Sequence, residues 1–201
     1  TLGVIPQEQT RASIGDLEAL SKQGNKIGIF GVEYSNPNAE VSALTDEWTE
    51  YPLMKNVQTN KVDPNSGTLY WGDYIYSYPI EDNLSVKFMA YFPYAPIAES
   101  GDNYVKTFIG SSPIYHFTIT GTEDLMIAAP VWGNKNKDPK SMEFRHMLTQ
   151  LRFQLQDLDG AFNGEKLEAI TITATHTKST MNLETGVLAP VPYTNLTLPT
   201  I

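Results

Sequence analysis

The stretch LSVKFMAYFPY, residues 84 to 94, constrains the fold more strongly than any other part of this chain. Its apolar side chains occupy every second position, namely Leu84, Val86, Phe88, Ala90 and Phe92. A spacing of two is the period of a β-strand, whereas one face of a helix needs spacings of three and four. Pro93 follows directly and is expected to end the strand. The stretch therefore predicts a β-strand with one face buried in a hydrophobic core.

Further short strands are predicted along the chain, with Gly, Pro and Asn between them as turn residues. They fall at residues 25–34, 114–120, 124–131, 151–156, 166–177 and 181–188. Residues 46–59 and the aromatic run at 68–79 look like two strands that pair across the turn-forming sequence KVDPNSG. The best helix candidate is residues 12–23, which would make two or three turns. Many short strands at close spacing favour an all-β protein, an antiparallel β-sandwich with at most short helices.

The composition excludes several classes of site and partner. The 201 residues include no cysteine, which excludes disulfides, thiolate metal sites and cysteine nucleophiles. The formal net charge of −9 disfavours nucleic acid and anionic lipid as partners, and no basic patch is visible in the sequence. No apolar run approaches the ~20 residues that span a bilayer, and the first residues lack the pattern of a signal peptide. Any export signal is therefore expected to lie outside the given sequence.

Three histidines are candidate metal ligands. His116, His146 and His176 lie on three different predicted strands, and three imidazoles could converge on zinc. None of them belongs to an HxH or HxxxH pair, so the spacing supplies no local template for a metal. We therefore expect these histidines to be strand residues bonded to backbone or water, and we predict no metal site.

The segment DLDGAFNGE, residues 157–165, superficially resembles a calcium-binding loop. Asp157 and Asp159 stand near two glycines, but the ligand spacing departs from that of an EF-hand. A hairpin turn between two strands is the simpler interpretation, and bound calcium at these two residues stays open.

Evidence for catalysis is missing from the sequence. It contains neither a GxSxG elbow nor a glycine-rich phosphate loop. We predict no catalytic residue, no cofactor and no enzymatic activity.

Aromatic residues are unusually concentrated. The chain holds 11 Tyr and 3 Trp, many of them in LYWGDYIYSYP and MAYFPYAP. One interpretation is a platform on which sugar rings stack. The other is that aromatic side chains, which favour strands, fill the core between sheets. We favour the core because Trp71 follows the same alternation as Leu69 and Ile75.

The stretch MEFRHMLTQLRFQLQ, residues 142–156, places a histidine beside an arginine. From Leu151 onward its apolar residues alternate as in a strand with one buried face. In its first half the apolar residues Phe144, Met147 and Leu148 are three and four apart, which fits either one helical turn or a β-bulge. His146 lies in this first half, so its role depends on the fold.

The order of these segments resembles the fimbrillin-like family of Bacteroidetes, the subunits of type V pili. The resemblance covers about residues 10 to 175. Its most specific pieces are the Tyr-Pro ahead of the strand that ends in AYFPY, the DLM segment, and a Phe-x-His-x-Leu-x-x-Leu pattern. The residues that carry this structural signature are Trp71, Tyr78, Pro79, Phe144, His146 and Leu148. In this interpretation His146 is architectural, with its imidazole in hydrogen bonds where the strand bends.

The resemblance implies a Greek-key β-sandwich of the transthyretin- or immunoglobulin-like type, in a non-enzymatic fimbrial subunit. It also implies a lipoprotein precursor that passes through the periplasm and is anchored in the outer membrane through a cysteine upstream of this chain. In that family, cleavage after an arginine removes an N-terminal strand, and a strand of a neighbouring subunit fills the gap. Arg11 is the arginine placed for such a cut. The implied partners are other pilus subunits, together with a host protein or glycan.

We expect three parts in the chain. Residues 1–24 form an N-terminal segment with a candidate propeptide strand, and residues 25–177 form the fimbrillin-like sandwich. Residues 178–201 form either a terminal strand or hairpin or the start of a truncated second domain. The alternative to a cell-surface fimbrial subunit is a monomeric surface module that binds glycans.

Overall fold

The fold is described from a computed structural model, and the description covers eleven parts of the chain. These are residues 4–6, 20–22, 24–34, 52–71, 76–108, 111–121, 123–137, 141–149, 173–174, 177–191 and 196–197. Strands dominate them, and helical conformation is confined to Leu20 and Ser21 within the described ranges. Most of the helix predicted at 12–23 lies outside those ranges. None of the helical residues described belongs to a helix that is long and apolar enough to cross a membrane.

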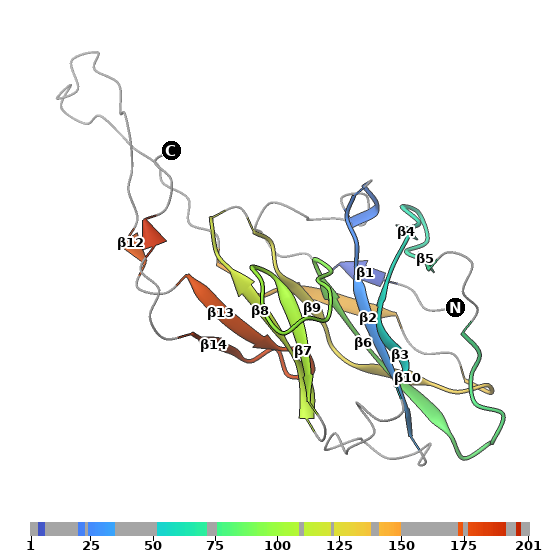
Figure 1. The fold of residues 1–201 in the computed structure, drawn as a ribbon. Helices are drawn as coiled ribbons and strands as arrows, with labels where there is room; N and C mark the ends of the chain where they lie inside the picture. The colour runs from blue at the N-terminus through green and yellow to red at the C-terminus, as the bar shows by residue number, and fades with distance from the viewer. Residues whose placement is uncertain are drawn as a thin grey trace, which may run out of the picture.

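Seven strands form a large sheet that runs through the molecule (Figure 1). They are β1 (Val4–Pro6), β2 (Gly28–Tyr34), β3 (Pro52–Gln58), β6 (Ser85–Phe92), β9 (Met126–Ala128), β10 (Val131–Gly133) and β11 (Met142–His146). The strand order is β1-β11-β9-β6-β2-β3, and β10 also pairs with β6. Every pair in this sheet is antiparallel except β1 with β11, which is parallel.

Four further strands form a small sheet in the order β14-β13-β8-β7. They are β7 (Tyr104–Phe108), β8 (Ser111–Thr118), β13 (Lys178–Asn182) and β14 (Leu188–Pro190). Two short ladders complete the described strands: β4 (Lys61–Val62) with β5 (Leu69–Tyr70), and β12 (Thr173–Ala174) with β15 (Leu196–Thr197). The hairpin β13–β14 pairs with β8, so this part of the C-terminal segment belongs to the small sheet.

The predicted all-β sandwich is confirmed, and so are the strands within 25–34 and 84–94. One predicted pairing is wrong. Strand β3, from the segment 46–59, pairs with β2 instead of with the aromatic run. Only β4 and β5 pair across the KVDPNSG turn, where Oδ1 of Asp63 accepts the amides of Asn65 and Ser66.

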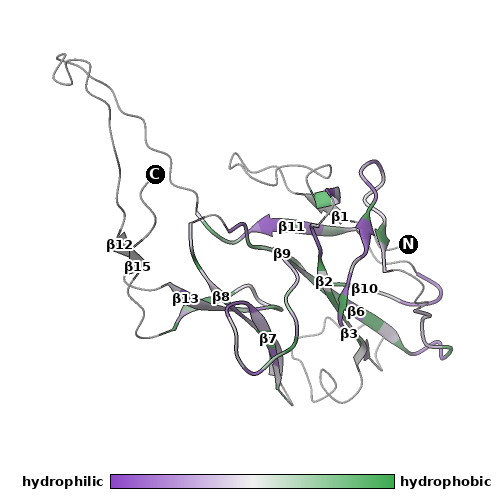
Figure 2. Ribbon diagram, turned by 45° about the horizontal axis from the view of Figure 1, so that its top comes forward, coloured by the Kyte–Doolittle hydropathy of each residue, from purple (hydrophilic) through white to green (hydrophobic). Residues whose placement is uncertain are grey.

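The large sheet is buried on both faces. The face toward the small sheet carries the inter-sheet core, whose members include Phe30, Val32, Met89, Tyr91, Val105, Tyr115, Phe117, Ile127 and Met181. The opposite face carries the outer core, whose members include Leu20, Ile27, Ile29, Met54, Val62, Leu69, Val86, Phe88, Phe92, Met142 and Phe144. Figure 2 shows hydrophobic residues on β2 and β6, where this sheet crosses the molecule.

Strand β6 corrects the prediction of a single buried face, because all eight of its residues are buried. The predicted face, with Phe88 and Phe92, lies in the outer core, and the alternate side chains of Met89 and Tyr91 lie in the inter-sheet core. Each large side chain that is fully buried contributes about 1.5–3 kcal/mol of transfer free energy. A central strand with two such faces therefore supplies apolar contacts to both layers of the sandwich.

A buried polar cluster ties β3 to β6. Asn56 has φ of 51° where the β2–β3 register shifts, which is the geometry of a β-bulge. Its amide nitrogen donates to the Ala95 carbonyl at 2.8 Å, and the Tyr91 hydroxyl donates to its side-chain oxygen at 2.6 Å. Burial raises the pKa of Tyr91 well above that of an exposed tyrosine. The Tyr91 ring is therefore fixed by hydrogen bonds as well as by packing.

Replacing Gly28 with alanine is expected to lower the free energy of unfolding by about 3 kcal/mol. The added Cβ would overlap Cε1 and Cζ of the Tyr91 ring, and that ring cannot move without breaking its buried hydrogen bonds. Overpacking costs about 1–3 kcal/mol, and an orphaned buried polar group costs about 1–3 kcal/mol more. Urea unfolding followed by circular dichroism measures the loss.

Gly31→Ala is the matched control on the same strand. Its Cβ would approach Cβ of Met54 at 3.3 Å, a tight contact that a shift of a few tenths of an ångström relieves, whereas the Cβ at position 28 would overlap atoms of the Tyr91 ring. A Gly28→Ala protein that is as stable as Gly31→Ala would show that the Tyr91 cluster is not rigid.

Candidate functional site

The first candidate site is the edge of the large sheet at β1. Strand β1 pairs in parallel with β11, with Val4 opposite Met142 and Pro6 opposite Phe144. The other edge of β11 pairs antiparallel with β9, so β11 is held from both sides. The β11 side chains of Met142 and Phe144 are fully buried in the outer core. Loss of β1 would expose the main-chain groups of one edge of β11 without removing these apolar anchors.

Arg11, the candidate cleavage site, lies outside the described residues. It follows β1 in the sequence and precedes β2. A cut after Arg11 would therefore separate β1 from the rest of the chain covalently. β1 would then be held only by its ladder of three residues and by whatever its side chains contact.

Three of the proposed signature residues belong to the outer core. Phe144 is one of its buried members, and Trp71 and Tyr78 pack against it as partly buried residues. The Tyr78 ring meets Phe88 edge-on at 6.3 Å, and Trp71 meets Tyr76 in the same way at 6.1 Å. These aromatic faces are used for packing, which leaves less of them for a sugar-stacking platform.

The other signature residues are not among the outer-core residues. Pro79 is half-buried in the segment ahead of β6, and Leu148 packs against the inter-sheet core. The signature is therefore distributed over both cores and does not form one site.

His146 ends β11 and has one close side-chain partner. Its Nδ1 lies 2.6 Å from Oδ1 of Asp124, and the two side chains are only 7% and 12% exposed. The alternation of β9 and β11 explains the pair, because His146 lies opposite Met126 and Asp124 stands two residues before Met126. Sequence reasoning expected this imidazole to bond to backbone or water, but its partner is a carboxylate side chain. The residues that follow continue the ladder, since the Met147 amide donates to the Leu125 carbonyl.

The other histidines do not join His146. His116 lies on β8 in the small sheet and stacks on Tyr104, with ring centroids 4.4 Å apart and planes 6° from parallel. Burial, with a smaller contribution from Lys106, lowers the pKa of His116. His176 lies outside the described residues, as do Asp157 and Asp159 of the candidate calcium loop. Within the part of the chain that is described, no three His, Asp or Glu side chains gather as metal ligands would.

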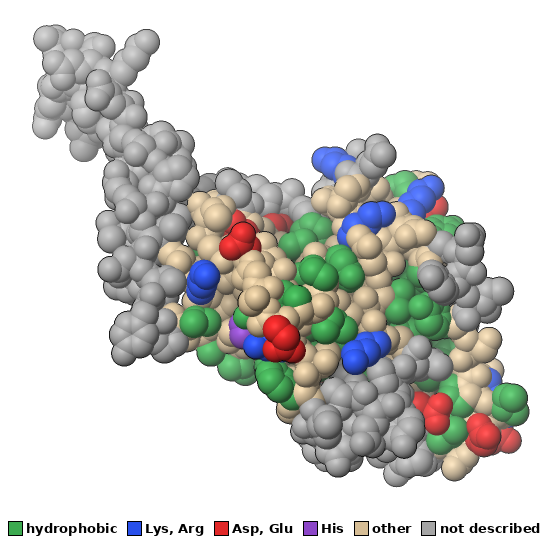
Figure 3. Space-filling view, viewed as in Figure 1, with side chains coloured by type: hydrophobic (Ala, Val, Ile, Leu, Met, Phe, Trp, Pro, Cys, Tyr) green, Lys and Arg blue, Asp and Glu red, His purple; other side chains and the backbone are tan. Residues whose placement is uncertain are grey.

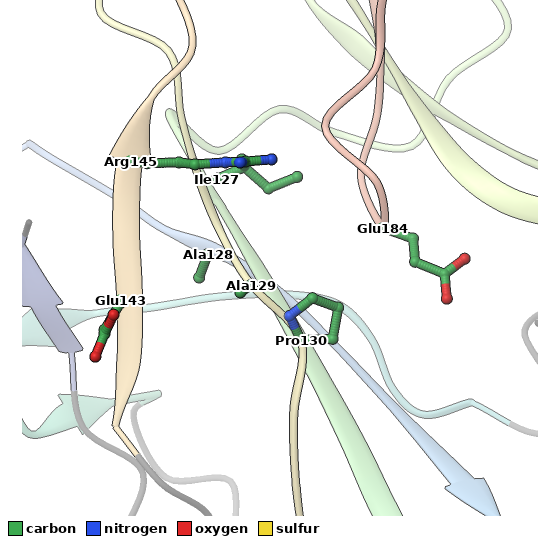
Figure 4. Close-up of a pocket in the computed structure, with 7 residues that line it drawn as sticks. All are labelled: Ile127, Ala128, Ala129, Pro130, Glu143, Arg145 and Glu184. Atoms are coloured by element: carbon green, nitrogen blue, oxygen red, sulfur yellow. The ribbon is translucent and has the colours of Figure 1, made fainter. Parts of the chain in front are cut away.

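A second candidate site is a pocket of about 290 Å³ beside the junction of β9 and β10. Its lining residues are Ile127, Ala128, Ala129, Pro130, Glu143, Arg145 and Glu184 (Figure 4). The Arg145 side chain extends from β11 toward the β13–β14 turn that carries Glu184. One of its terminal nitrogens donates to the Thr185 carbonyl at 3.3 Å. We refer to this site as the junction pocket.

Glu184 connects the two sheets. One carboxylate oxygen lies 2.6 Å from Nζ of Lys87 on β6, and the other accepts the Ser112 hydroxyl of β8 at 2.8 Å. The side chains of Lys87 and Glu184 are 5% and 18% exposed. Sequence reasoning missed both residues. The available signal was a lysine in the middle of a strand whose alternate side chains, at Met89 and Tyr91, are apolar.

Comparison with known proteins points to one family. A sequence model described as fimbrillin-like matches residues 10–197. The chain is also similar to a crystal structure of a candidate cell adhesion protein from Bacteroides uniformis ATCC 8492, with a TM-score of 0.59 and 19% identity. That match covers 98% of this chain and 69% of the other, and it supports the fold. A comparison with curated proteins gives no match.

Proposed function

This chain belongs to the fimbrillin-like family, and from that premise we propose that it is a fimbrial subunit that assembles by exchange of β-strands. The family is one of structural and adhesion proteins, which supports a place at the cell surface. In the proposed mechanism, cleavage after Arg11 releases β1 from the edge of the large sheet. A strand from a neighbouring subunit then pairs with the exposed edge of β11.

The observation that carries this proposal is the position of β1. It is a short strand at the end of a sheet, it precedes Arg11, and its pairing with β11 is parallel in a sheet that is otherwise antiparallel. Strand addition at such an edge derives affinity from main-chain hydrogen bonds and specificity from alternate side chains. The buried side chains of Met142 and Phe144 would keep β11 in place while its edge is open.

The proposal also includes the route to the surface. We infer a precursor that crosses the periplasm as a lipoprotein and is anchored in the outer membrane by a lipid upstream of this chain. The partners in assembly are then other subunits of the same or a similar sequence, and a host protein or glycan is the target of adhesion.

Treatment with an arginine-specific protease tests the exchange. The protein is expected to lose residues 1–11, as seen by intact mass, and then to form polymers that light scattering and negative-stain electron microscopy detect. Arg11→Gln is expected to block both steps. Arg152→Gln is the control, because it removes an arginine but leaves the candidate cut site intact.

A synthetic peptide of residues 1–11 supplies a second arm. Added in excess after cleavage, it should occupy the β11 edge and slow polymerisation. The proposal is wrong if the cleaved protein stays monomeric, or if Arg11→Gln polymerises as fast as the unaltered protein under protease.

A further inference from the structure

The junction pocket lies where the segment that joins β9 to β10 carries one residue more than the part of β6 with which the two strands pair. Four residue steps separate Ile127 from Val131, whereas three steps separate their partners on β6, Tyr91 and Phe88 (131 − 127 = 4; 91 − 88 = 3). This is the count of a β-bulge, which bends a strand and re-aims its side chains. Because of the extra residue, Trp132 lies on the same face of the sheet as Ile127, although the two are five positions apart.

The bulge also lies where the pairing of this strand with β11 ends. The β9–β11 ladder ends at the pair of Ala128 with Phe144, and Pro130 beyond it has no amide hydrogen to donate. The floor of the pocket is apolar and consists of Ala128, Ala129 and Pro130. The pocket is also lined by Arg145 and Glu143 from β11 and by Glu184 from the β13–β14 turn, and Glu143 points to the other side of β11 from Arg145 (Figure 4).

The charges at the pocket balance. Glu143 and Glu184 are its carboxylates, Arg145 is a cation of the wall, and Lys87 is the cation paired with Glu184. A charged ligand would add a charge that no group of the pocket is left to balance. A neutral ligand with several hydroxyl groups instead accepts hydrogen bonds from a guanidinium and donates them to carboxylates, and such charge-assisted bonds are the stronger ones. The described residues give the Arg145 guanidinium one hydrogen bond, and a guanidinium carries five N–H donors.

An exposed aromatic residue, Trp132, follows the pocket-lining residue Pro130 two positions later in the chain. Trp132 lies directly opposite Lys87 in the β10–β6 ladder, so the two side chains share the face on which Lys87 meets Glu184. Trp132 is 40% exposed, whereas Trp71 packs against the outer core. The flat face of an exposed indole offers an apolar surface of the size of a sugar ring.

From these observations we propose that the junction pocket binds one ring of a neutral sugar. Arg145 would donate hydrogen bonds to the ring hydroxyls, the Ala-Pro floor would contact the ring carbons, and Trp132 would border the next residue of a glycan. The volume of about 290 Å³ lies just below the ~300–1,000 Å³ usual for small-molecule sites, which suits a single ring. The inference deepens the proposed adhesive function by naming a ligand class, and it does not depend on strand exchange.

Titration of the uncleaved protein tests the site. The probes are the methyl glycosides of glucose, galactose and mannose, with N-acetylneuraminic acid as a charged comparison, followed by saturation-transfer and chemical-shift NMR. At least one neutral glycoside is expected to bind saturably with Kd of about 1–10 mM, as a shallow single-ring site allows. Arg145→Gln and Trp132→Ala are each expected to weaken that binding by about tenfold.

Two controls match the pocket variants. Lys106→Gln removes a cation on the small sheet, and Tyr70→Ala removes a 47% exposed aromatic ring on β5. Both should bind the sugar as the unaltered protein does, and thermal melts check that all four variants are folded. The inference is overturned if no neutral glycoside binds, if the pocket variants bind as well as the controls, or if the charged sugar binds more tightly. Because the uncleaved monomer is used, none of these results bears on polymerisation.

Discussion

Replacing Phe88 with aspartate is expected to abolish folding. Phe88 is 6% exposed at the centre of the outer core, and its ring contacts Tyr78 edge-on. Loss of a buried phenyl group costs about 3–5 kcal/mol, and an unpaired carboxylate in an apolar site costs several kcal/mol more. The sum approaches or exceeds the ~5–15 kcal/mol that stabilises a typical domain. Near-ultraviolet circular dichroism and urea unfolding should show no cooperative transition.

Phe108→Asp is the control for this change, because Phe108 is also a strand phenylalanine but is 46% exposed. It should lower the free energy of unfolding by less than ~1 kcal/mol, the range of most surface substitutions. A conservative Phe88→Leu protein should fold with reduced stability, which keeps the test informative when the aspartate variant cannot be purified. A Phe88→Asp protein with a normal unfolding transition would contradict the outer core as described.

Removing one partner of the Lys87–Glu184 ion pair is expected to have the second largest effect. Glu184→Ala leaves the Lys87 ammonium, which is only 5% exposed, without its carboxylate. Breaking a buried pair in this way costs about 3–5 kcal/mol, because a charge then remains in a low-dielectric site. The same change removes the acceptor of the Ser112 hydroxyl, so a hydrogen bond within the small sheet is lost as well. Urea unfolding of the purified variant gives the magnitude.

A double variant separates the loss of the ion pair from the cost of leaving one charge unpaired. The double variant Lys87→Met, Glu184→Leu replaces both charges with apolar side chains, and we expect it to be more stable than Glu184→Ala. The surface pair of Lys135 with Asp82, at 2.9 Å and largely exposed, is the matched control. Its Lys135→Met variant should change stability by less than ~1 kcal/mol. Equal effects at the two pairs would show that Lys87 is not buried in solution.

The sequence predicted the fold class because alternation is a local property. The run from Leu84 to Phe92 can bury its apolar residues only as a strand, whatever its neighbours are. Neighbouring strands then favour a sandwich, because each apolar face needs a partner layer. The order of the segments indicated the family, which no single residue identifies.

The sequence did not predict strand pairing where the two strands are distant along the chain. Strand β3 pairs with β2 and not with the described part of the aromatic run that follows it, and β2 in turn pairs with β6 along all seven of its residues. The burial of β6 on both faces also depends on distant segments of the chain. Alternation showed one apolar face, and only the packed small sheet shows that Lys87 on the other face is buried with a partner from the β13–β14 turn.

The candidate sites also differ in whether the sequence or only the tertiary structure identified them. Arg11 and the signature residues came from the resemblance of the sequence to a family, since single residues and short motifs can be matched without a fold. The junction pocket was not found in this way, because it is assembled from β9, β11 and a turn that are far apart along the chain. Local spacing thus determined that this protein is made of strands and which side chains alternate. Tertiary packing alone decided which strands meet, which charges are paired away from water, and where a bulge leaves room for a ligand.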